Sequence, residues 1–277
     1  MGIFLCDLVT FGICLLSIQK LKNETKLSSG IPKKDIAAKA ALNWLKERPA
    51  FLRLLSFIAF INSGFAVVSA VQSPLILSTH SPAMLSVAIA ILGMGTWLGG
   101  KTFSRIARHS SGEAAVLLGI TVESFAMIFL GTSTQLWSLL CSMFTMGVSA
   151  AVVASANQTI WQLNVPYELQ GRIMSIRMIV AQSTPLIALL TTVPLQRAVF
   201  EPLIAAGSQD QSSWITLIWG AHAGSSIGMM VSSLSTLIFI VTLLILGRGG
   251  LGLRHFSDKA VTTKAPSKPL YQQEEHP

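Results

Sequence analysis

The sequence predicts an all-α integral membrane protein with about seven transmembrane helices, and three observations point to this class. Only 12% of the 277 residues are charged, whereas 51% are hydrophobic; soluble proteins carry roughly 25% charged residues. Several stretches are apolar over the roughly 20 residues that a helix needs to cross about 30 Å of hydrocarbon. The basic residues, which give a net charge of +8, lie between these stretches.

Seven stretches qualify as spans. In chain order they are residues 1–19, 53–77, 82–100, 113–131, 135–157, 173–195 and 227–247. Short polar turns at 78–82 and 131–135 predict that the helices on either side are antiparallel neighbours. The segment 214–222 admits two interpretations, an outer interfacial segment or the start of the last crossing.

For the first apolar stretch, a retained span is favoured over a cleaved signal peptide. A signal peptide begins with a basic region and ends at a small-residue cleavage site. Here Asp7 is the only early charge, and the lysines follow the apolar run.

The distribution of basic residues predicts the orientation of the chain. If the spans alternate, nineteen of the 20 Lys and Arg fall on one side of the membrane and only Arg197 falls on the other. Lys and Arg are enriched in cytoplasmic loops, so we expect an N-terminus outside and a C-terminus in the cytoplasm, in the plasma (inner) membrane. The same distribution argues against a nucleic-acid partner, because the basic residues sit between spans.

The parts outside the spans differ in composition. Residues 20–50 form a basic linker, within which Asp35 is a plausible N-cap and Trp44 lies on the apolar side of a short helix. We expect this helix on the cytoplasmic membrane surface, with its lysines facing anionic headgroups. Residues 51–248 form the membrane bundle, and residues 249–277 form a disordered polar tail.

Catalytic constellations do not emerge from the sequence. The five histidines lie in separate loops or in the tail, and the three cysteines lie in apolar stretches. Neither a zinc-binding spacing, a phosphate-binding loop nor a nucleophile elbow is present. We therefore predict no catalytic residue, no metal, no cofactor and no enzymatic activity.

Polar side chains inside the expected spans are the main functional candidates, because they are costly in a bilayer. Glu123 lies near the middle of its span. Two interpretations stay open for it: a carboxyl that carries a proton or faces a cationic substrate, or a neutral carboxyl that contacts a neighbouring helix. Asp7 lies nearer the outer end, where a solvated structural role is favoured. Asn62, Gln72 and Gln182 are also candidates, although helix contacts are favoured over substrate contacts for them.

Small residues and prolines mark two of the spans. Gly95 and Gly99 lie four residues apart, a spacing that allows helix backbones to approach closely. Pro185 and Pro194 predict a kink or an end within the span at 173–195.

The segment from Asn157 to Gln182, NQTIWQLNVPYELQGRIMSIRMIVAQ, is the most informative loop. Pro166 starts a helical turn that carries Glu168 four residues before Arg172, a spacing that permits an ion pair, and Gly171 lies between them. By itself this is an exposed salt bridge of under about 1 kcal/mol.

This segment resembles the loop between helices ten and eleven in the drug and macrolide-efflux-like branch of the major facilitator superfamily. GGKTFSRIARH, from Gly99, is similar to a degenerate copy of the superfamily's cytoplasmic motif between helices eight and nine. Gly100, Arg105 and Arg108 match that motif, while Ser104 stands where Asp is expected. VFEPL, from Val199, resembles the outer loop before the last helix, and FLCDLVTF resembles part of helix six.

The resemblance implies that the chain corresponds to helix six through helix twelve of a twelve-helix transporter, with a C-terminal six-helix bundle preceded by one extra helix. It further implies that Gly100, Arg105, Arg108, Glu168, Gly171 and Arg172 belong to cytoplasmic gating loops. In this family two bundles rock about a central site, so the chain would supply one wall of the cavity.

We therefore expect the C-terminal half of a secondary transporter that exports a small, amphipathic molecule by alternating access. Its partners would be the lipid bilayer and either a separate N-terminal half or a second copy. The alternative expectation is a truncated remnant or a structural membrane protein that folds as a bundle and transports nothing.

Overall fold

The computed structural model describes residues 11–12, 16–17, 34–109, 111–209, 214–220, 222 and 224–253. The expected first span, with its candidate Asp7, lies almost entirely outside these residues, as do most of the linker and residues 254–277 of the expected tail. The expected start of a disordered tail at residue 249 is wrong, because residues 251–253 donate backbone hydrogen bonds to Glu113. The chain divides into two compact units, residues 1–39 and 40–277. The described residues of the first unit are helical, and the expected membrane bundle lies in the second.

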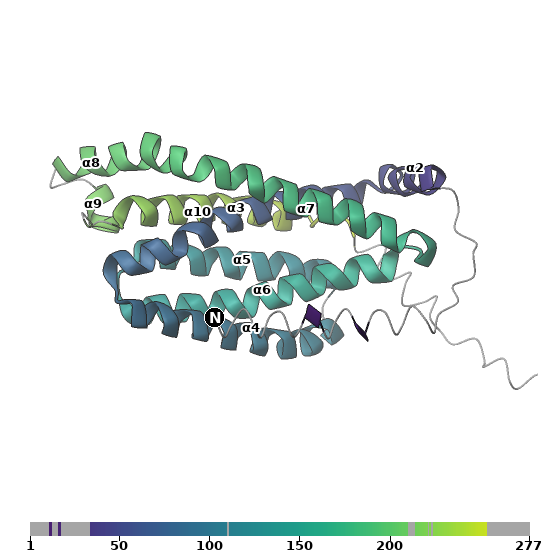
Figure 1. The fold of residues 1–277 in the computed structure, drawn as a ribbon, viewed down its shortest axis with the longest axis horizontal. Helices are drawn as coiled ribbons and strands as arrows, with labels where there is room; N and C mark the ends of the chain where they lie inside the picture. The colour runs from purple at the N-terminus through teal and green to yellow at the C-terminus, as the bar shows by residue number, and fades with distance from the viewer. Residues whose placement is uncertain are drawn as a thin grey trace, which may run out of the picture. The chain divides into compact units, whose positions relative to one another are not determined.

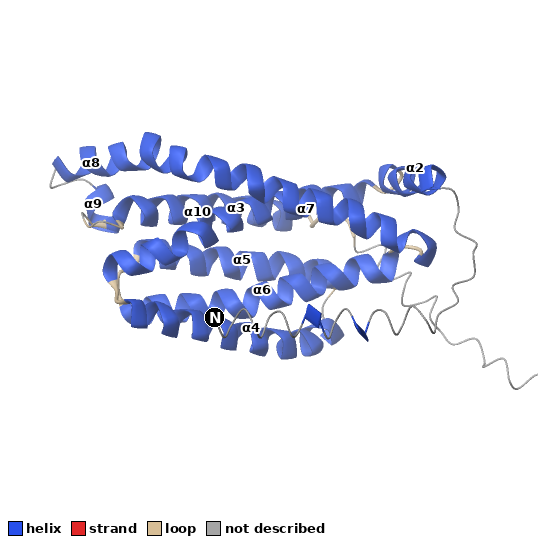
Figure 2. Cartoon of the chain, in the orientation of Figure 1, coloured by secondary structure: helices blue, strands red, loops and turns tan. Residues whose placement is uncertain are grey.

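Six long helices form the second unit (Figures 1 and 2). They are α3 (Pro49–Thr79), α4 (Pro82–His109), α5 (Gly112–Thr132), α6 (Leu136–Asn164), α7 (Tyr167–Leu195) and α10 (Ser225–Gly247). Each is long and apolar enough to cross a membrane, and no strand occurs among the described residues. The prediction of an all-α integral membrane protein is confirmed, and these six helices match the last six of the expected spans.

Three helices extend well beyond their expected ends, and α6 is one of them, since it runs to Asn164 rather than 157. α4 continues through Lys101 to His109, and α7 passes both Pro185 and Pro194 into a π-helical turn, η1 (Gln196–Phe200), and then α8 (Glu201–Gln209). The VFEPL segment, which resembles an outer loop before the last helix, is therefore helical in the structure. Proline inside a membrane helix is tolerated because π-helical adjustments and neighbouring groups satisfy the freed backbone carbonyls.

The ambiguous segment 214–222 contains a separate short helix, α9 (Trp214–Trp219). The helix is followed by Gly220, whose φ of 70° is a left-handed conformation that glycine adopts without strain. Two hydrogen bonds tie this segment to the start of α10: Trp219 Nε1 donates to Ser232 Oγ at 2.8 Å, and Ser225 Oγ donates to the Trp219 carbonyl at 2.9 Å. The last span therefore begins at Ser225.

In chain order the six helices form two groups of three, α3–α4–α5 and α6–α7–α10, and the main packing contacts run between the two groups. α4 packs along α6, and α7 packs along α3, so the second helix of each group lies against the first helix of the other. α5 also packs against α6 and α10, and α10 touches α3. This arrangement places α5 and α10 together and leaves α4 and α7 each packed mainly against one neighbour.

The buried side chains form two hydrophobic clusters, one toward each end of the bundle. In the first, the Phe51 ring lies 5.1 Å from Trp44 and 5.2 Å from Trp161, measured between ring centroids. Trp44 belongs to α2 (Lys34–Lys46), and with Ala41 and Leu45 it is buried. The apolar side of this expected surface helix therefore packs against protein rather than against lipid.

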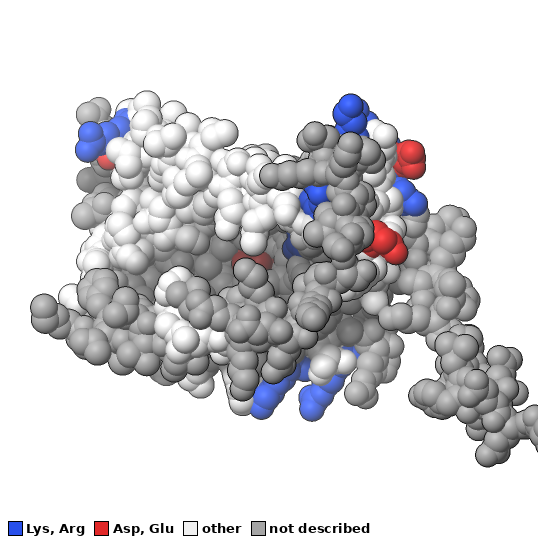
Figure 3. All heavy atoms as spheres, turned by 45° about the vertical axis from the view of Figure 1, so that its right-hand side comes forward, with Lys and Arg blue, Asp and Glu red and all other residues white. Residues whose placement is uncertain are grey.

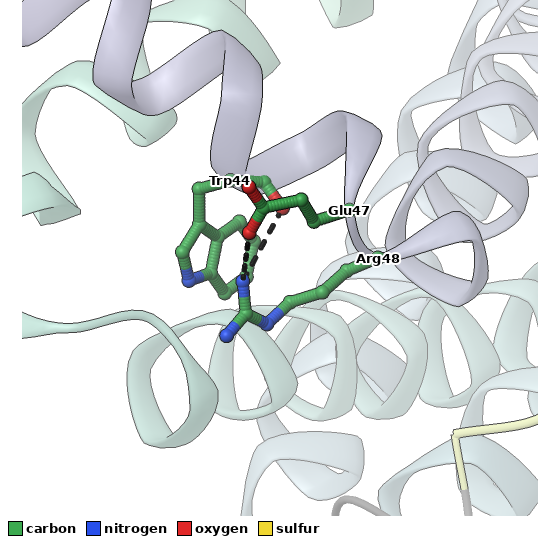
Figure 4. A network of polar contacts seen from close by, with 3 residues as sticks. All are labelled: Trp44, Glu47 and Arg48. Atoms are coloured by element: carbon green, nitrogen blue, oxygen red, sulfur yellow. Dashed lines mark hydrogen bonds and ion pairs between the residues drawn. The ribbon is translucent and has the colours of Figure 1, made fainter.

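A small polar network fixes the turn from α2 into α3 (Figure 4). Arg48 Nη1 donates to the Trp44 carbonyl at 3.4 Å, and the guanidinium lies 4.5 Å from the Trp44 ring centroid. Glu47 pairs with Arg48 at 3.9 Å. The pair is largely exposed and contributes little to stability, so the buried Trp44 ring is the main anchor.

The two ends of the bundle differ in charge. We call the end at which α3, α5 and α7 begin the basic end, and the opposite one the far end. Arg48, Arg53, Lys101, Arg105, Arg172 and Arg248 lie at the basic end, whereas Arg197 lies at the far end. Figure 3 shows blue Lys and Arg groups toward both ends of the molecule, with mostly white surface and one red acidic patch between them where the surface is not grey. Basic groups gathered at the ends are expected for helices that cross a bilayer.

Candidate functional site

Glu123 is the most unusual polar residue of the bundle. It lies near the middle of α5 and is 5% exposed. Its Oε2 atom has no hydrogen-bond partner in the described part of the chain. It lies one helical turn after Gly119, where an added methyl group would meet Val153 of α6, so it belongs to the side of α5 that faces α6. A buried carboxyl oxygen without a partner is costly, which makes Glu123 a functional candidate.

The other embedded polar candidates contribute mainly to helix packing. Gln72 Nε2 contacts Met143 Sδ at 2.7 Å and so joins α3 to α6. Asn62 is half-buried on α3, and Gln182 is exposed on α7. Near Gln182, the Thr184 hydroxyl donates to the Ala59 carbonyl at 3.3 Å and joins α7 to α3. In the structure as described, no hydrogen bond links Glu123, Asn62, Gln72 and Gln182 into one site.

Two larger grooves are lined by other residues. One, of about 410 Å³, lies between α5 and α6 toward the far end, and Phe125, Phe129 and Trp137 contribute to its walls. The other, of about 610 Å³, lies between α3 and α10 at the basic end. None of the polar residues predicted from the sequence lines either groove.

The contact between α4 and α6 depends on glycine, as the spacing of Gly95 and Gly99 predicts. A methyl group at Gly99 would lie against the Val148 carbonyl oxygen, and one at Gly147 would lie against backbone atoms of Leu92 and Thr96. Such contacts hold two helix backbones closer together than any side chain would allow.

The predicted gating residues lie at the basic end, but on helices rather than in loops. Gly100, Arg105 and Arg108 belong to α4, and Glu168, Gly171 and Arg172 belong to the first turns of α7. Arg105 and Glu168 are exposed, and Arg172 is half-buried; the Arg108 side chain is outside the described residues. Gly100 and Gly171 have open space where a side chain would be, so neither serves a close helix contact.

Sequence reasoning missed a buried carboxylate at the basic end. Glu113, in the first turn of α5, is 4% exposed and accepts hydrogen bonds from the backbone of the segment after α10. Its Oε1 accepts from the N–H groups of Leu251 and of Gly252, the latter at 3.1 Å, and its Oε2 accepts from Leu253 at 2.8 Å. Three backbone donors on one carboxylate form a strong, directional anchor.

The segment that binds Glu113 has the sequence GRGGLGL. Gly249, Gly250 and Gly252 have φ values of 90°, 91° and 84°, a left-handed backbone that other residues rarely adopt. A methyl group at Gly250 would also collide with the Glu113 carboxylate. The cluster of glycines directly after a span was the available sequence signal, but it does not identify an acidic partner more than 130 residues earlier.

A second missed contact joins α6 to α7. Arg177 Nη1 donates to Gln158 Oε1 at 2.7 Å, and its guanidinium lies 5.7 Å from the Trp161 ring centroid. α7 thus contacts α6 through one basic side chain near the basic end, in addition to its packing along α3.

Burial is very uneven among the six helices. In the most apolar stretch of α5, 61% of the residues are buried, compared with 17% in α4 and 6% in α7. Large apolar side chains are exposed on both of the latter, including Met94 and Trp97 on α4 and Ile179 and Leu190 on α7. α4 and α7 therefore carry the extensive faces that the described residues leave uncovered.

Comparisons with known proteins agree with this architecture. The chain superposes on the crystal structure of a bacterial homolog to the human lysosomal transporter Spinster, in an inward-facing and unoccupied conformation, with a TM-score of 0.58 and 14% sequence identity. At that identity the likeness concerns the fold. The match covers 88% of this chain and 54% of that protein, so the chain spans about half of the transporter's length.

Sequence comparison gives the family. A search of curated protein sequences found no match. The sequence profile of the Major Facilitator Superfamily matches residues 2–189, which is well over half of the chain. The chain therefore belongs to the Major Facilitator Superfamily.

Proposed function

We propose that this chain is the C-terminal half, helix six through helix twelve, of a secondary transporter of the drug and macrolide-efflux-like branch. It exports a small amphipathic molecule by alternating access together with a second bundle. The observation that carries this proposal is the exposure of α4 and α7, whose apolar faces the described residues leave uncovered. The half-length match to a solved transporter supports it.

In this proposal the second bundle comes from a separate N-terminal half or from a second copy of the chain, and it packs on α4 and α7. Gly100, Arg105 and Arg108 on α4, and Glu168, Gly171 and Arg172 on α7, then lie at the basic end of the joint between the bundles. Charged groups there hold the bundles together when that end is closed and release them when it opens.

The orientation follows from the positive-inside rule. The basic end faces the cytoplasm, the N-terminus lies outside and the protein resides in the plasma (inner) membrane. A fluorescent protein fused after residue 253 should fold and fluoresce, while alkaline phosphatase at the same position should be inactive. Active phosphatase at that position contradicts the orientation.

Glu123 is the candidate for coupling. A carboxyl group in the middle of a span can exchange a proton or face a cationic substrate when a water-filled cavity reaches it. Its buried position on the α6 side of α5, together with the unpartnered Oε2 atom, supports a role that requires a change of environment during transport.

Disulfide cross-linking in membranes tests the uncovered faces directly. In a background with Cys6, Cys14 and Cys141 changed to Ser, Leu190→Cys places a thiol on the exposed side of α7, where Leu190 is 79% exposed. Leu244→Cys on α10, where Leu244 is 57% exposed, is the matched control. We expect a cross-linked species with Leu190→Cys and none with Leu244→Cys.

The size of the adduct identifies the second bundle. An adduct of twice the chain mass indicates a second copy, and a mixed adduct indicates a separate half. Equal behaviour of the two variants contradicts the pairing on α7.

A transport assay tests the activity itself. Cells that express this chain alone should accumulate a fluorescent amphipathic cation as empty-vector cells do, because one bundle supplies one wall of the cavity. Measurable efflux by the chain alone contradicts the need for a second bundle. Unchanged accumulation after the cross-linked partner is supplied favours the alternative of a non-transporting protein.

A further inference from the structure

The groove between α3 and α10 has a charged mouth and apolar walls. Its volume is about 610 Å³, and Arg53 and Arg248 are the basic residues in its lining. Phe57 and Phe60 of α3 face Val241 and Ile245 of α10 along its length. A lining of this kind suits a molecule with an anionic group at one end and a hydrocarbon chain at the other.

The charged and apolar parts follow one another along the helix axes. Phe60 lies seven residues after Arg53, and Val241 lies seven residues before Arg248. At 1.5 Å per residue, each helix carries the lining about 10 Å from the basic end toward the middle of the bundle. The lining therefore changes from cationic to apolar in the direction in which a bilayer changes from headgroup to hydrocarbon.

Both arginines are available to a ligand. Among the residues whose placement is described, neither the Arg53 nor the Arg248 guanidinium has a hydrogen-bond or ion-pair partner. The carboxylate oxygens of the buried acid Glu113 accept the backbone N–H groups of Leu251, Gly252 and Leu253. That anchor also fixes the groove wall that Gly250 and Leu251 contribute.

The depth of the groove fits the membrane. α10 has 23 residues, about 35 Å of helix, whereas the hydrocarbon core is about 30 Å thick. Arg248, directly after the helix, therefore lies at the level of the lipid headgroups. The guanidinium fork matches phosphate oxygens in geometry and charge, and basic pockets between membrane helices bind anionic headgroups.

We propose that this groove binds one anionic phospholipid. Arg53 and Arg248 hold its phosphate group, and an acyl chain lies between Phe60 and Val241. The groove is separate from the α4 and α7 faces, so the lipid occupies its site whether or not a second bundle is present.

Native mass spectrometry of the full chain in detergent tests this site, with phosphatidylglycerol and phosphatidylcholine as the added lipids. We expect one phosphatidylglycerol to stay bound under conditions that remove phosphatidylcholine. Arg53→Gln combined with Arg248→Gln should lower the affinity for phosphatidylglycerol by about tenfold or more. Arg197→Gln, an exposed arginine at the far end, is the matched control and should change nothing.

Two further variants keep the test decisive if the double variant does not fold. Arg53→Gln alone should weaken phosphatidylglycerol binding several-fold, and Val241→Trp should weaken it by filling the groove without changing the charge. Equal binding of the two lipids, unchanged binding in these variants, or displacement of phosphatidylglycerol by millimolar inorganic phosphate would overturn the proposal; the last outcome would indicate a site for free anions.

Discussion

The Oε2 atom of Glu113 accepts a 2.8 Å hydrogen bond from the backbone N–H of Leu253, 140 residues later in the chain. With the two bonds to Oε1, it joins the start of α5 to the segment that follows α10. The contact closes the basic end of the α5–α10 pair with a buried charge and three backbone donors.

Replacing Glu113 should therefore destabilise the bundle. Glu113→Ala leaves three backbone donors without their acceptor, and we expect a loss of about 2 to 3 kcal/mol. Glu113→Gln keeps one acceptor oxygen and should lose less. The measurement is unfolding in a titration from mild detergent into SDS, followed by circular dichroism. Glu201→Ala, an exposed acid in the first turn of α8, is the control; a similar loss there would contradict the assignment.

Alanine substitution of a glycine in the GRGGLGL segment should change stability in the opposite direction to alanine substitution of a helical glycine. Gly250→Ala forces a left-handed φ on alanine and places a methyl group against Glu113, so a loss of at least about 1 kcal/mol is expected. Gly171→Ala occupies open space on α7 and should stabilise the helix by up to about 1 kcal/mol. Thermal unfolding in detergent measures both stability changes. If both variants were destabilised or both were stabilised, the difference in backbone conformation would not be the cause.

The α4–α6 contact makes a similar pair of variants informative. Gly147→Ala pushes a methyl group into the backbone of α4 near Leu92 and Thr96, and we expect a loss of about 1 to 3 kcal/mol because backbone cannot move aside. Gly93→Ala, on a side of α4 with open space, should cause no loss and should stabilise the helix by up to about 1 kcal/mol, as at Gly171. Comparison of the two unfolding midpoints checks this, and a loss at Gly93 as large as at Gly147 would contradict the close backbone contact as the cause.

Glu123 should show opposite effects on stability and on transport. Glu123→Met removes an unpartnered buried carboxyl oxygen and is expected to stabilise the chain by about 1 kcal/mol or more. Glu123→Gln should lower the rate of transport by the two-bundle assembly if the carboxyl carries a proton. The measurements are SDS unfolding and dye efflux. A less stable Glu123→Met protein would indicate that the carboxyl has a structural partner. Unchanged efflux by Glu123→Gln would indicate that Glu123 serves helix packing rather than transport.

Composition and hydropathy were sufficient to predict the membrane class and the six described spans, because the cost of burying polar groups in hydrocarbon acts on every residue of a span. They could not fix the ends of α4 and α7. Lys101 and Pro194 read as signals to end a helix, yet both lie inside continuous helical segments, since end signals are weaker than the demand to satisfy backbone groups near a bilayer.

The candidate site was predicted in part. Glu123 stood out because an isolated acid in an apolar run is rare, whereas Glu113 resembled an ordinary first-turn acid that favours a helix N-terminus. Only the folded chain brings it to the backbone of Leu253. Likewise Arg53 and Arg248 read as flanking charges, and their common groove arises from the packing of α3 and α10.

The continuous helix from α7 through η1 into α8 also has a mechanical consequence. Residues Tyr167–Gly207 form one helical segment of 41 residues that contains an apolar, membrane-crossing stretch; its length is about 60 Å at 1.5 Å per residue, twice the hydrocarbon thickness. It must tilt strongly or project beyond the membrane. If the segment moves as a rigid rod, rotation by a few degrees about the Thr184 contact with α3 would displace its tip near Gly207 by several ångströms, so a small rearrangement deep in the bilayer would be amplified at the far surface.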